Sequence, residues 1–184
     1  LGGAWFWFGF QCRSNELRTR FFLSYMLSWW VGGGLLAVYF SSAGPAYYTL
    51  VGLSPDPYQP LMAYLADVNT RLPIWILDAQ RLLWDGYTGK ADAIGISAFP
   101  SMHNASALIF AFAFSQVNRK AGWFFYGYAA VILVGSVHSG WHYAVDGYAG
   151  LAIAWASWAV AGVVARWHGT RAEVAHLNKS LASL

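Results

Sequence analysis

The sequence predicts an all-α membrane protein, a multi-pass helical bundle, and two observations carry this prediction. Apolar residues make up 58% of the 184 residues, and charged residues only 10%, whereas a soluble domain carries about 25% charged residues. A soluble fold of this length buries about two thirds of the surface that its unfolded chain exposes, so it could not hide so much apolar surface. Four long stretches of the chain also lack Asp, Glu, Lys and Arg altogether. Together these features exclude a soluble enzyme and a disordered chain.

The net charge and the cysteine count exclude other classes. The net charge of +3 comes with no basic cluster, so we expect no nucleic-acid partner. Cys12 is the only cysteine, which excludes a disulfide framework and a cysteine-rich zinc module. The expected partners are membrane lipids, and the sequence leaves the oligomeric state open.

The chain is expected to cross the membrane four times in full. A bilayer core of about 30 Å needs about 20 apolar residues per helix, and the charge-free stretches are residues 21–43, 93–118, 121–145 and 147–165. Residues 1–10 are apolar but too short to span, and we interpret them as the end of a helix whose beginning is missing. The full protein would then have about six transmembrane helices. Because there is no repeat or linker, residues 1–184 are read as a single domain.

Basic residues predict the orientation of these helices. Eight of them fall in three segments, residues 11–20, 119–120 and 166–179, which alternating helices place on one side of the membrane. By the positive-inside rule this side is cytoplasmic, and the tail at residues 168–184 lies there. The long connection at residues 42–97 then lies on the extracytoplasmic side, periplasmic or lumenal.

Two short helices are expected to lie in the membrane interface within this connection. Apolar residues recur at spacings of three and four between Pro60 and Pro73, the pattern of a helix with one apolar face. Residues 74–84 form a second such segment, with Trp75 and Trp84 at headgroup depth.

Ionisable side chains inside the spans mark the candidate active site, because such residues are costly in a membrane. They are His103, His138, His142 and Asp146. Pro100 suits the first position of a helix, so Ser101 and His103 are expected in its first turn, where free N–H groups form an anion site.

His142 and Asp146 are four residues apart and would share one face of a helix. Asp146 could then accept a hydrogen bond from one ring N–H and leave the other nitrogen neutral and nucleophilic. With His103 opposite, this arrangement suits phosphoryl transfer through a phosphohistidine. His138 is an accessory candidate, either near the site or ending the preceding helix.

The strings FPSMH at residues 99–103 and HYAVD at residues 142–146 resemble the type 2 phosphatidic acid phosphatase superfamily. The resemblance is closest to the branch of the inositol phosphorylceramide synthases, the aureobasidin-resistance proteins. It implies a six-helix membrane enzyme that uses no metal and no other cofactor. It also implies that His142 attacks phosphorus, Asp146 orients His142, His103 protonates the leaving oxygen, and Ser101 helps to hold the phosphate.

The chain departs from this family at two phosphate-holding motifs. The family has a Lys-x6-Arg-Pro motif before the first His, where the nearest match here is Arg71-Leu72-Pro73, and its phosphatase branch has a Ser-Arg pair where this chain reads Gly135-Ser136. These departures favour the synthase-like branch. Arg81 and Lys90, both in the outer connection, are the candidates to supply the missing charge.

The sequence therefore predicts a lipid phosphotransferase or phosphatase that acts on a lipid-linked phosphate ester. One form of the reaction passes an inositol-phosphate head group to a lipid alcohol, and another is hydrolysis by water. Two alternatives stay open. His103, His138, His142 and Asp146 are also possible ligands of a metal-dependent intramembrane hydrolase, and the same cluster could serve a lipid-binding or transport bundle with no enzymatic activity. The sequence does not identify the lipid.

Overall fold

The regular secondary structure of the protein is helical throughout the part described by the computed structural model, residues 2–92 and 96–181. The N-terminal segment forms α1 (Gly2–Phe6) and the π-helical turn η1 (Trp7–Gln11). One continuous rod then combines α2 (Asn15–Ser28), the π-helical segment η2 (Trp29–Leu36) and α3 (Ala37–Tyr39). The outer connection holds η3 (Pro45–Tyr47), α4 (Gln59–Arg71) and α5 (Trp75–Tyr87), and the rest of the bundle is α6 (Met102–Val117), α7 (Arg119–His138) and α8 (Ala144–Leu181).

Three helical runs are long and apolar enough to cross a membrane, at Asn15–Tyr39, Arg119–His138 and Ala144–Thr170 among the described residues. The all-α membrane bundle is thereby confirmed. The predicted extent of the span at residues 93–118 is wrong, because α6 begins only at Met102 and has 16 residues, about 24 Å at 1.5 Å per residue. Residues 96–101 are not helical, which is consistent with Pro100, because a proline disfavours the helical conformation of the residue before it.

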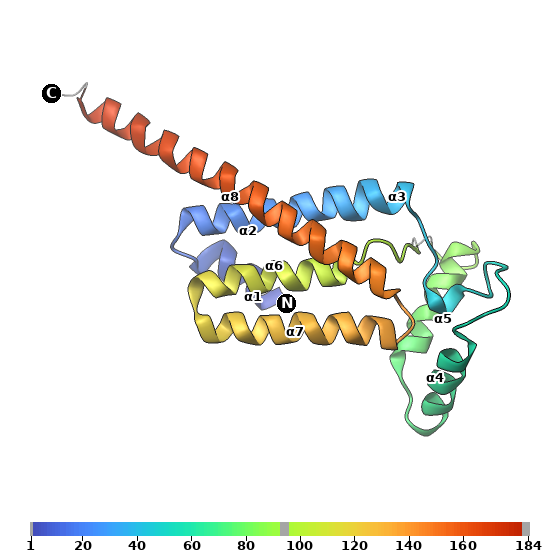
Figure 1. Ribbon diagram of the computed structural model, residues 1–184. Coiled ribbons are helices and arrows are strands. Elements are labelled where there is room, and N and C mark those ends of the chain that lie inside the picture. Colours follow the sequence, from blue (N-terminus) through green and yellow to red (C-terminus); the bar gives the residue numbers. More distant parts are fainter. Residues whose placement is uncertain (1, 93–95, 182–184) are drawn as a thin grey trace.

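Helix α6 is the centre of the bundle and packs against α2, α7 and α8 (Figure 1). Its alanines are fully buried, Ala105, Ala111 and Ala113 among them, and small side chains let neighbouring helices approach closely in a membrane. Phe21 and Phe110 fill the space beside them. Because α6 is enclosed by other helices, polar residues at its end are shielded from lipid.

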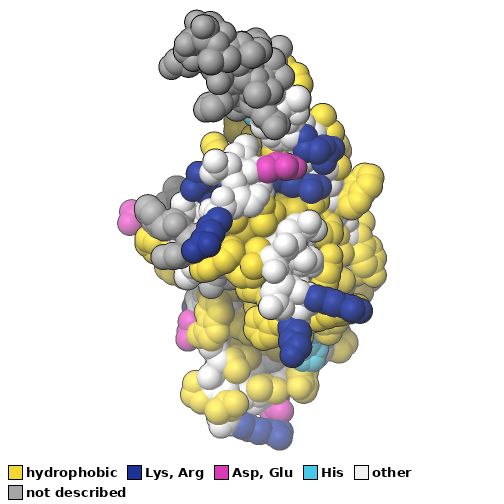
Figure 2. Space-filling view, turned by 90° about the vertical axis from the view of Figure 1, so that its left-hand side faces the viewer, with side chains coloured by type: hydrophobic (Ala, Val, Ile, Leu, Met, Phe, Trp, Pro, Cys, Tyr) yellow, Lys and Arg dark blue, Asp and Glu magenta, His cyan; other side chains and the backbone are white. Residues whose placement is uncertain are grey.

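The two short helices of the outer connection are confirmed at nearly the predicted positions. Figure 1 shows α4 and α5 gathered at one end of the bundle, beside the start of α6 and the connection between α7 and α8. At the opposite end lie the start of α2 and the turn between α6 and α7. Figure 2 looks onto this opposite end and shows Lys and Arg side chains gathered there.

The C-terminal segment is part of α8 as far as Leu181. Residues 168–184 were expected as a tail that follows the last span. The described part of this segment is helical and extends beyond the bundle (Figure 1), and residues 182–184 lie outside the described part. This extension leaves the bundle at the end that carries the basic residues.

Candidate active site

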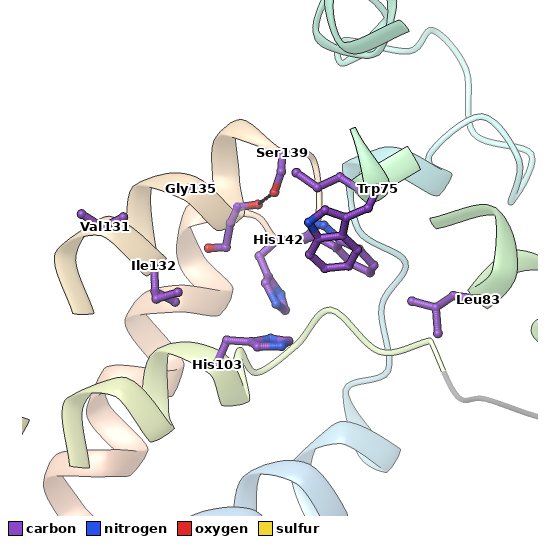
Figure 3. Close-up of a pocket in the computed structure, with 11 residues that line it drawn as sticks. Trp75, Leu83, His103, Val131, Ile132, Gly135, Ser139 and His142 are labelled. Atoms are coloured by element: carbon purple, nitrogen blue, oxygen red, sulfur yellow. Dashed lines mark hydrogen bonds between the residues drawn. The ribbon is translucent and has the colours of Figure 1, made fainter. Parts of the chain in front are cut away.

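His103 and His142 face one another at the end of the bundle that also holds α4 and α5. Their ring centroids are 5.9 Å apart and the ring planes are inclined by 61°. Figure 3 shows the two rings pointing toward each other, His103 from α6 and His142 from the connection between α7 and α8. The predicted meeting of the two histidine motifs at one place is therefore present in the structure.

The turn after α7 brings His142 to this place. The helix ends at His138, the Ser139 N–H donates to the Gly135 carbonyl, and Gly140 has a φ of +72°, a conformation that glycine adopts without the strain of a side chain. His142 therefore lies before α8, which begins at Ala144. The prediction that His142 and Asp146 share one helix face is wrong, because only Asp146 is on the helix.

A backbone carbonyl orients the His142 ring. Nδ1 of His142 lies 2.7 Å from the Ala98 carbonyl oxygen, and the nearest Asp146 oxygen is 3.8 Å from the same nitrogen. Asp146 Oδ2 instead accepts the Tyr143 N–H at 2.8 Å. The hydrogen bond expected from Asp146 is thus made by Ala98. The sequence could not predict this contact, because every residue has a backbone carbonyl and nothing along the chain marks the one that meets His142.

This arrangement suits a nucleophilic imidazole. If Nδ1–H donates to the Ala98 carbonyl, Nε2 keeps its lone pair. Asp146 is 1% exposed and His142 6%, so the carboxylate and the ring lie in a poorly solvated environment, where electrostatic interactions are weakly screened.

Ser101 has a structural position and does not line the pockets beside the histidines. It is the N-cap of α6, so Pro100 lies outside the helix and the first turn begins at Met102. Ser101 is fully buried, its N–H donates to the Asp146 carbonyl, and its Oγ accepts from Asn104. The predicted first-turn position is wrong, and these contacts join the start of α6 to α8.

Asn104 is a buried polar residue that sequence reasoning missed. Its Nδ2 lies 2.9 Å from Ser101 Oγ and 3.5 Å from Ser136 Oγ. Its Oδ1 has no hydrogen-bond partner among the described residues. The available signal was an amide side chain one residue after His103 on a mainly apolar helix.

Three pockets meet at the histidine pair. We call the first the α5–α7 chamber, about 570 Å³, which His103 and His142 line together with Trp75, Ile76, Leu83, Val131, Ile132, Gly135, Ser136, Ser139 and Trp141 (Figure 3). We call the second the π-segment chamber, about 590 Å³, which the two histidines line with Trp29, Gly33, Ala37, Val38, Ser41, Ile96, Ser97, Pro100 and Met102. A smaller pocket of about 160 Å³ lies between them beside Tyr47 and Ala98.

Gln80 attaches α5 to the active-site connection. Gln80 is 5% exposed, and its side-chain Nε2 donates to the Ser139 backbone carbonyl at 2.9 Å. The backbone carbonyl of Gln80 accepts from the Tyr47 hydroxyl at 3.0 Å. Burial raises the pKa of Tyr47 to about 12, so this hydroxyl stays protonated and remains a donor at neutral pH. Sequence reasoning missed Gln80, although it is a polar residue on the otherwise apolar face of α5.

Arg81, Lys90 and His138 are not among the residues that line the three pockets. Arg81 and Lys90 are exposed, and Arg81 lies 3.8 Å from Asp78 on its own helix. His138 is exposed, and its ring packs against Tyr64 at 5.9 Å. Within the described part of the chain, no Lys or Arg lines the three pockets. The first turn of α6 has N–H groups with no partner within the helix, and groups of this kind can bind an anion.

The four residues considered as metal ligands are not assembled into one site. Among the side chains that the structure describes, no group of three or more His, Cys, Asp or Glu residues is placed to hold a metal ion. The His138 ring packs against Tyr64 of α4. The alternative of a metal-dependent hydrolase therefore lacks its predicted ligand set.

Comparison with known proteins adds one finding. The family model of the PAP2 superfamily matches residues 4–160, a range that contains both histidine motifs. The match supports the superfamily and does not single out the inositol phosphorylceramide synthase branch. No curated protein and no solved structure matches the chain.

Proposed function

We propose that this chain, which belongs to the PAP2 superfamily, transfers the phosphoryl group of a lipid-linked phosphate ester through a phosphohistidine on His142. Membership makes it a membrane enzyme of the phosphatase or phosphotransferase type. The observation that carries the finer proposal is the contact of 2.7 Å between His142 Nδ1 and the Ala98 carbonyl, which leaves Nε2 as the nucleophile beside His103.

The reaction has two displacements at phosphorus. In the first, Nε2 of His142 bonds to phosphorus, the bond from phosphorus to the lipid oxygen breaks, and His103 gives its proton to that oxygen. In the second, the acceptor hydroxyl gives its proton to His103 and its oxygen bonds to phosphorus. The bond between phosphorus and Nε2 then breaks, and the electron pair returns to the ring.

Asp146 and the first turn of α6 have electrostatic roles in this scheme. The Asp146 carboxylate, 3.8 Å from Nδ1, stabilises the positive charge that the ring gains when Nε2 bonds to phosphorus. The N–H groups of the first turn of α6 face the phosphate oxygens and replace the cations of the missing motifs. Neither Arg81 nor Lys90 is needed for this role.

The substrate is a lipid because the walls of both large chambers are mainly aromatic and aliphatic. Transfer of an inositol-phosphate head group, as in the synthase branch, is one reaction that fits. The basic end of the bundle (Figure 2) is assigned to the cytoplasm by the positive-inside rule, which puts the histidine pair and the membrane lipids that it acts on at the extracytoplasmic side. The C-terminus is then cytoplasmic.

The test is to trap the intermediate. Purified protein in detergent is mixed with lipid phosphate carrying ³²P, quenched within milliseconds to seconds, and analysed for label that is stable in base and lost in acid, as expected of a phosphohistidine. We expect label on wild type and on His138→Ala, and none on His142→Ala. Label that persists on His142→Ala would contradict the proposal. Loss of all turnover on EDTA treatment, with recovery on added zinc, would instead favour the metal-dependent alternative.

A further inference from the structure

Asn104 follows His103 in the first turn of α6 and is fully buried. It lines none of the three pockets beside the histidines, so we do not expect it to touch a bound substrate. Packing alone does not call for an amide at this position. The Asn104 Oδ1 atom is buried without a hydrogen-bond partner among the described residues, an arrangement that costs stability. The role of the side chain therefore lies in its two N–H groups.

The hydrogen bonds of Ser136 determine which way this amide points. The Ser136 hydroxyl donates to the Leu133 carbonyl at 3.0 Å, so its oxygen is left to accept a hydrogen bond. Asn104 Nδ2 lies 3.5 Å from this oxygen, and only the nitrogen of an amide can donate. The same nitrogen donates to Ser101 Oγ at 2.9 Å. The amide thus joins the start of α6 to the last turn of α7.

Ser136 also holds the segment that carries His142. The backbone carbonyl of Ser136 accepts the N–H of Trp141 at 3.1 Å and the N–H of His142 at 3.2 Å. On the other side, Asn104 is the chain neighbour of His103. A short path of contacts through Asn104 and Ser136 therefore connects the two histidines, whose ring centroids are 5.9 Å apart.

Helix α8 closes the third side of this arrangement. The Ser101 N–H donates to the Asp146 carbonyl at 2.9 Å, and a Cβ atom at Gly147 would lie only 3.3 Å from Asn104 Nδ2. The amide is thus enclosed by α6, α7 and α8. Removal of its N–H groups would loosen the first turn of α6 from its neighbours, and this turn carries His103.

We propose that Asn104 is a positioning residue that holds His103 at the distance from His142 that phosphoryl transfer needs. This inference rests on the proposed phosphohistidine function. His103 must reach the leaving oxygen while Nε2 of His142 attacks the same phosphorus, and misplacement of a reacting group by about 1 Å can cost about 10²-fold in rate. The amide acts through His103 and takes no part in the making or breaking of bonds.

Asn104→Leu keeps nearly the same side-chain shape and removes both donors. We expect kcat for a lipid phosphate to fall by about 10²-fold. KM should stay within about twofold of wild type, because a residue outside the pockets does not contribute to uniform binding of the substrate. The loss with nitrophenyl phosphate should stay below about tenfold, since its phenolate leaves without a proton from His103. Equal losses with both substrates would overturn the proposal.

A double mutant shows whether Asn104 acts through His103. In a His103→Ala background the general acid is already absent. Adding Asn104→Leu should then lower the rate with the lipid phosphate by less than about threefold, because two changes that remove the same function are not additive. A further loss as large as the one in wild type would show that Asn104 acts independently of His103 and would overturn the proposal.

Ile109→Ala is the matched control for a general loss of stability. Ile109 is fully buried on the same helix and lines none of the three pockets, and its truncation leaves a cavity. The variant should have a lower thermal midpoint and an unchanged ratio of the rates with the two substrates. A change of this ratio equal to that in Asn104→Leu would count decisively against a positioning role.

Ser136→Ala removes the same contact from the α7 side and keeps the test available where Asn104→Leu does not yield folded protein. It should change the ratio of the two rates in the same direction as Asn104→Leu, and the change should disappear in the His103→Ala background. An unchanged ratio in Ser136→Ala would overturn the proposed path from Asn104 to His142.

Rapid-quench labelling with ³²P separates this proposal from the proposed function. Absence of label on His142 in wild type would overturn both. Label that forms from a lipid phosphate on His142 of Asn104→Leu as fast as in wild type would overturn only the positioning role. The expected result is label on His142 in both proteins, formed about 10²-fold more slowly in Asn104→Leu.

Discussion

His142 Nδ1 is 2.7 Å from the Ala98 carbonyl oxygen and 3.8 Å from Asp146 Oδ2, so a backbone group and not a carboxylate orients the ring. Ala98 lies in the non-helical segment before α6, residues 96–101. The orientation of His142 therefore depends on the path of this segment. The role that remains for Asp146 is mainly electrostatic.

Asp146→Asn is expected to slow the reaction without disturbing the tautomer of His142. A charge about 4 Å away contributes at most about 4 kcal/mol at an effective dielectric constant near 20, so we expect a loss of kcat on the order of 10²–10³. In a serine protease, where the carboxylate sets the tautomer, the equivalent change costs about 10⁴. The measurement is kcat with a lipid phosphate, and a loss of 10⁴ or more would indicate that Asp146 sets the tautomer here too.

His103→Ala is expected to affect poor leaving groups far more than good ones. A general acid matters in proportion to how much the leaving oxygen needs a proton. The variant should lose on the order of 10²–10⁴ in rate with a lipid phosphate and much less with nitrophenyl phosphate, whose phenolate leaves unprotonated. His142→Ala, the matched control, should lose activity with both substrates. Equal losses by both variants on both substrates would leave phosphate binding as the shared role.

Gln80→Leu is expected to loosen α5 from the active-site connection. The substitution leaves the buried Ser139 carbonyl without its donor, at a cost of about 1–3 kcal/mol. Since α5 forms a wall of the α5–α7 chamber, KM for the lipid should rise severalfold while kcat changes less. Arg81→Leu on the exposed face of the same helix is the control and should match wild type. A fall in kcat alone for Gln80→Leu would contradict this positioning role.

Gly150→Ala is expected to destabilise the protein. A Cβ atom at Gly150 would collide with the Ser101 carbonyl oxygen, a backbone atom that cannot rotate away, and overpacking of this kind costs about 1–3 kcal/mol. Gly127→Ala is the control in α7, because a Cβ there meets no atom within 4 Å. Thermal unfolding in detergent should show a lower midpoint for Gly150→Ala and no decrease for Gly127→Ala. Equal midpoints would argue against the close approach of α8 and α6.

Single cysteines should report the orientation of the bundle. In a Cys12→Ser background, a cysteine at Lys120 should react with a membrane-impermeant maleimide only from the cytoplasmic side. A cysteine at Asp92 should react only from the other side. Both positions are exposed, so access to reagent is set by the membrane. Reaction at position 92 from the cytoplasm would place the histidine pair on that side instead.

The sequence by itself determined the helical membrane class, the two short outer helices and the pairing of His103 with His142. These follow from local information, namely apolar runs of membrane-spanning length, three-and-four spacing, and the positions of the two histidine motifs relative to the predicted helices. The same local rules misplaced Ser101 and put His142 on a helix, because periodicity does not reveal at which residue a helix begins.

Only the tertiary structure decided which group orients His142 and which side chains hold the elements around it. The Ala98 carbonyl, Asn104 and Gln80 come from three different segments, and no spacing along the chain relates them to His142. For the same reason the sequence could not show that Arg81 lies 3.8 Å from Asp78 on its own helix or that the His138 ring packs against Tyr64. The two chambers likewise exist only after the π-helical segment and α5 have packed on either side of α6, since a cavity is defined by the surfaces that several elements leave uncovered and not by any one of them.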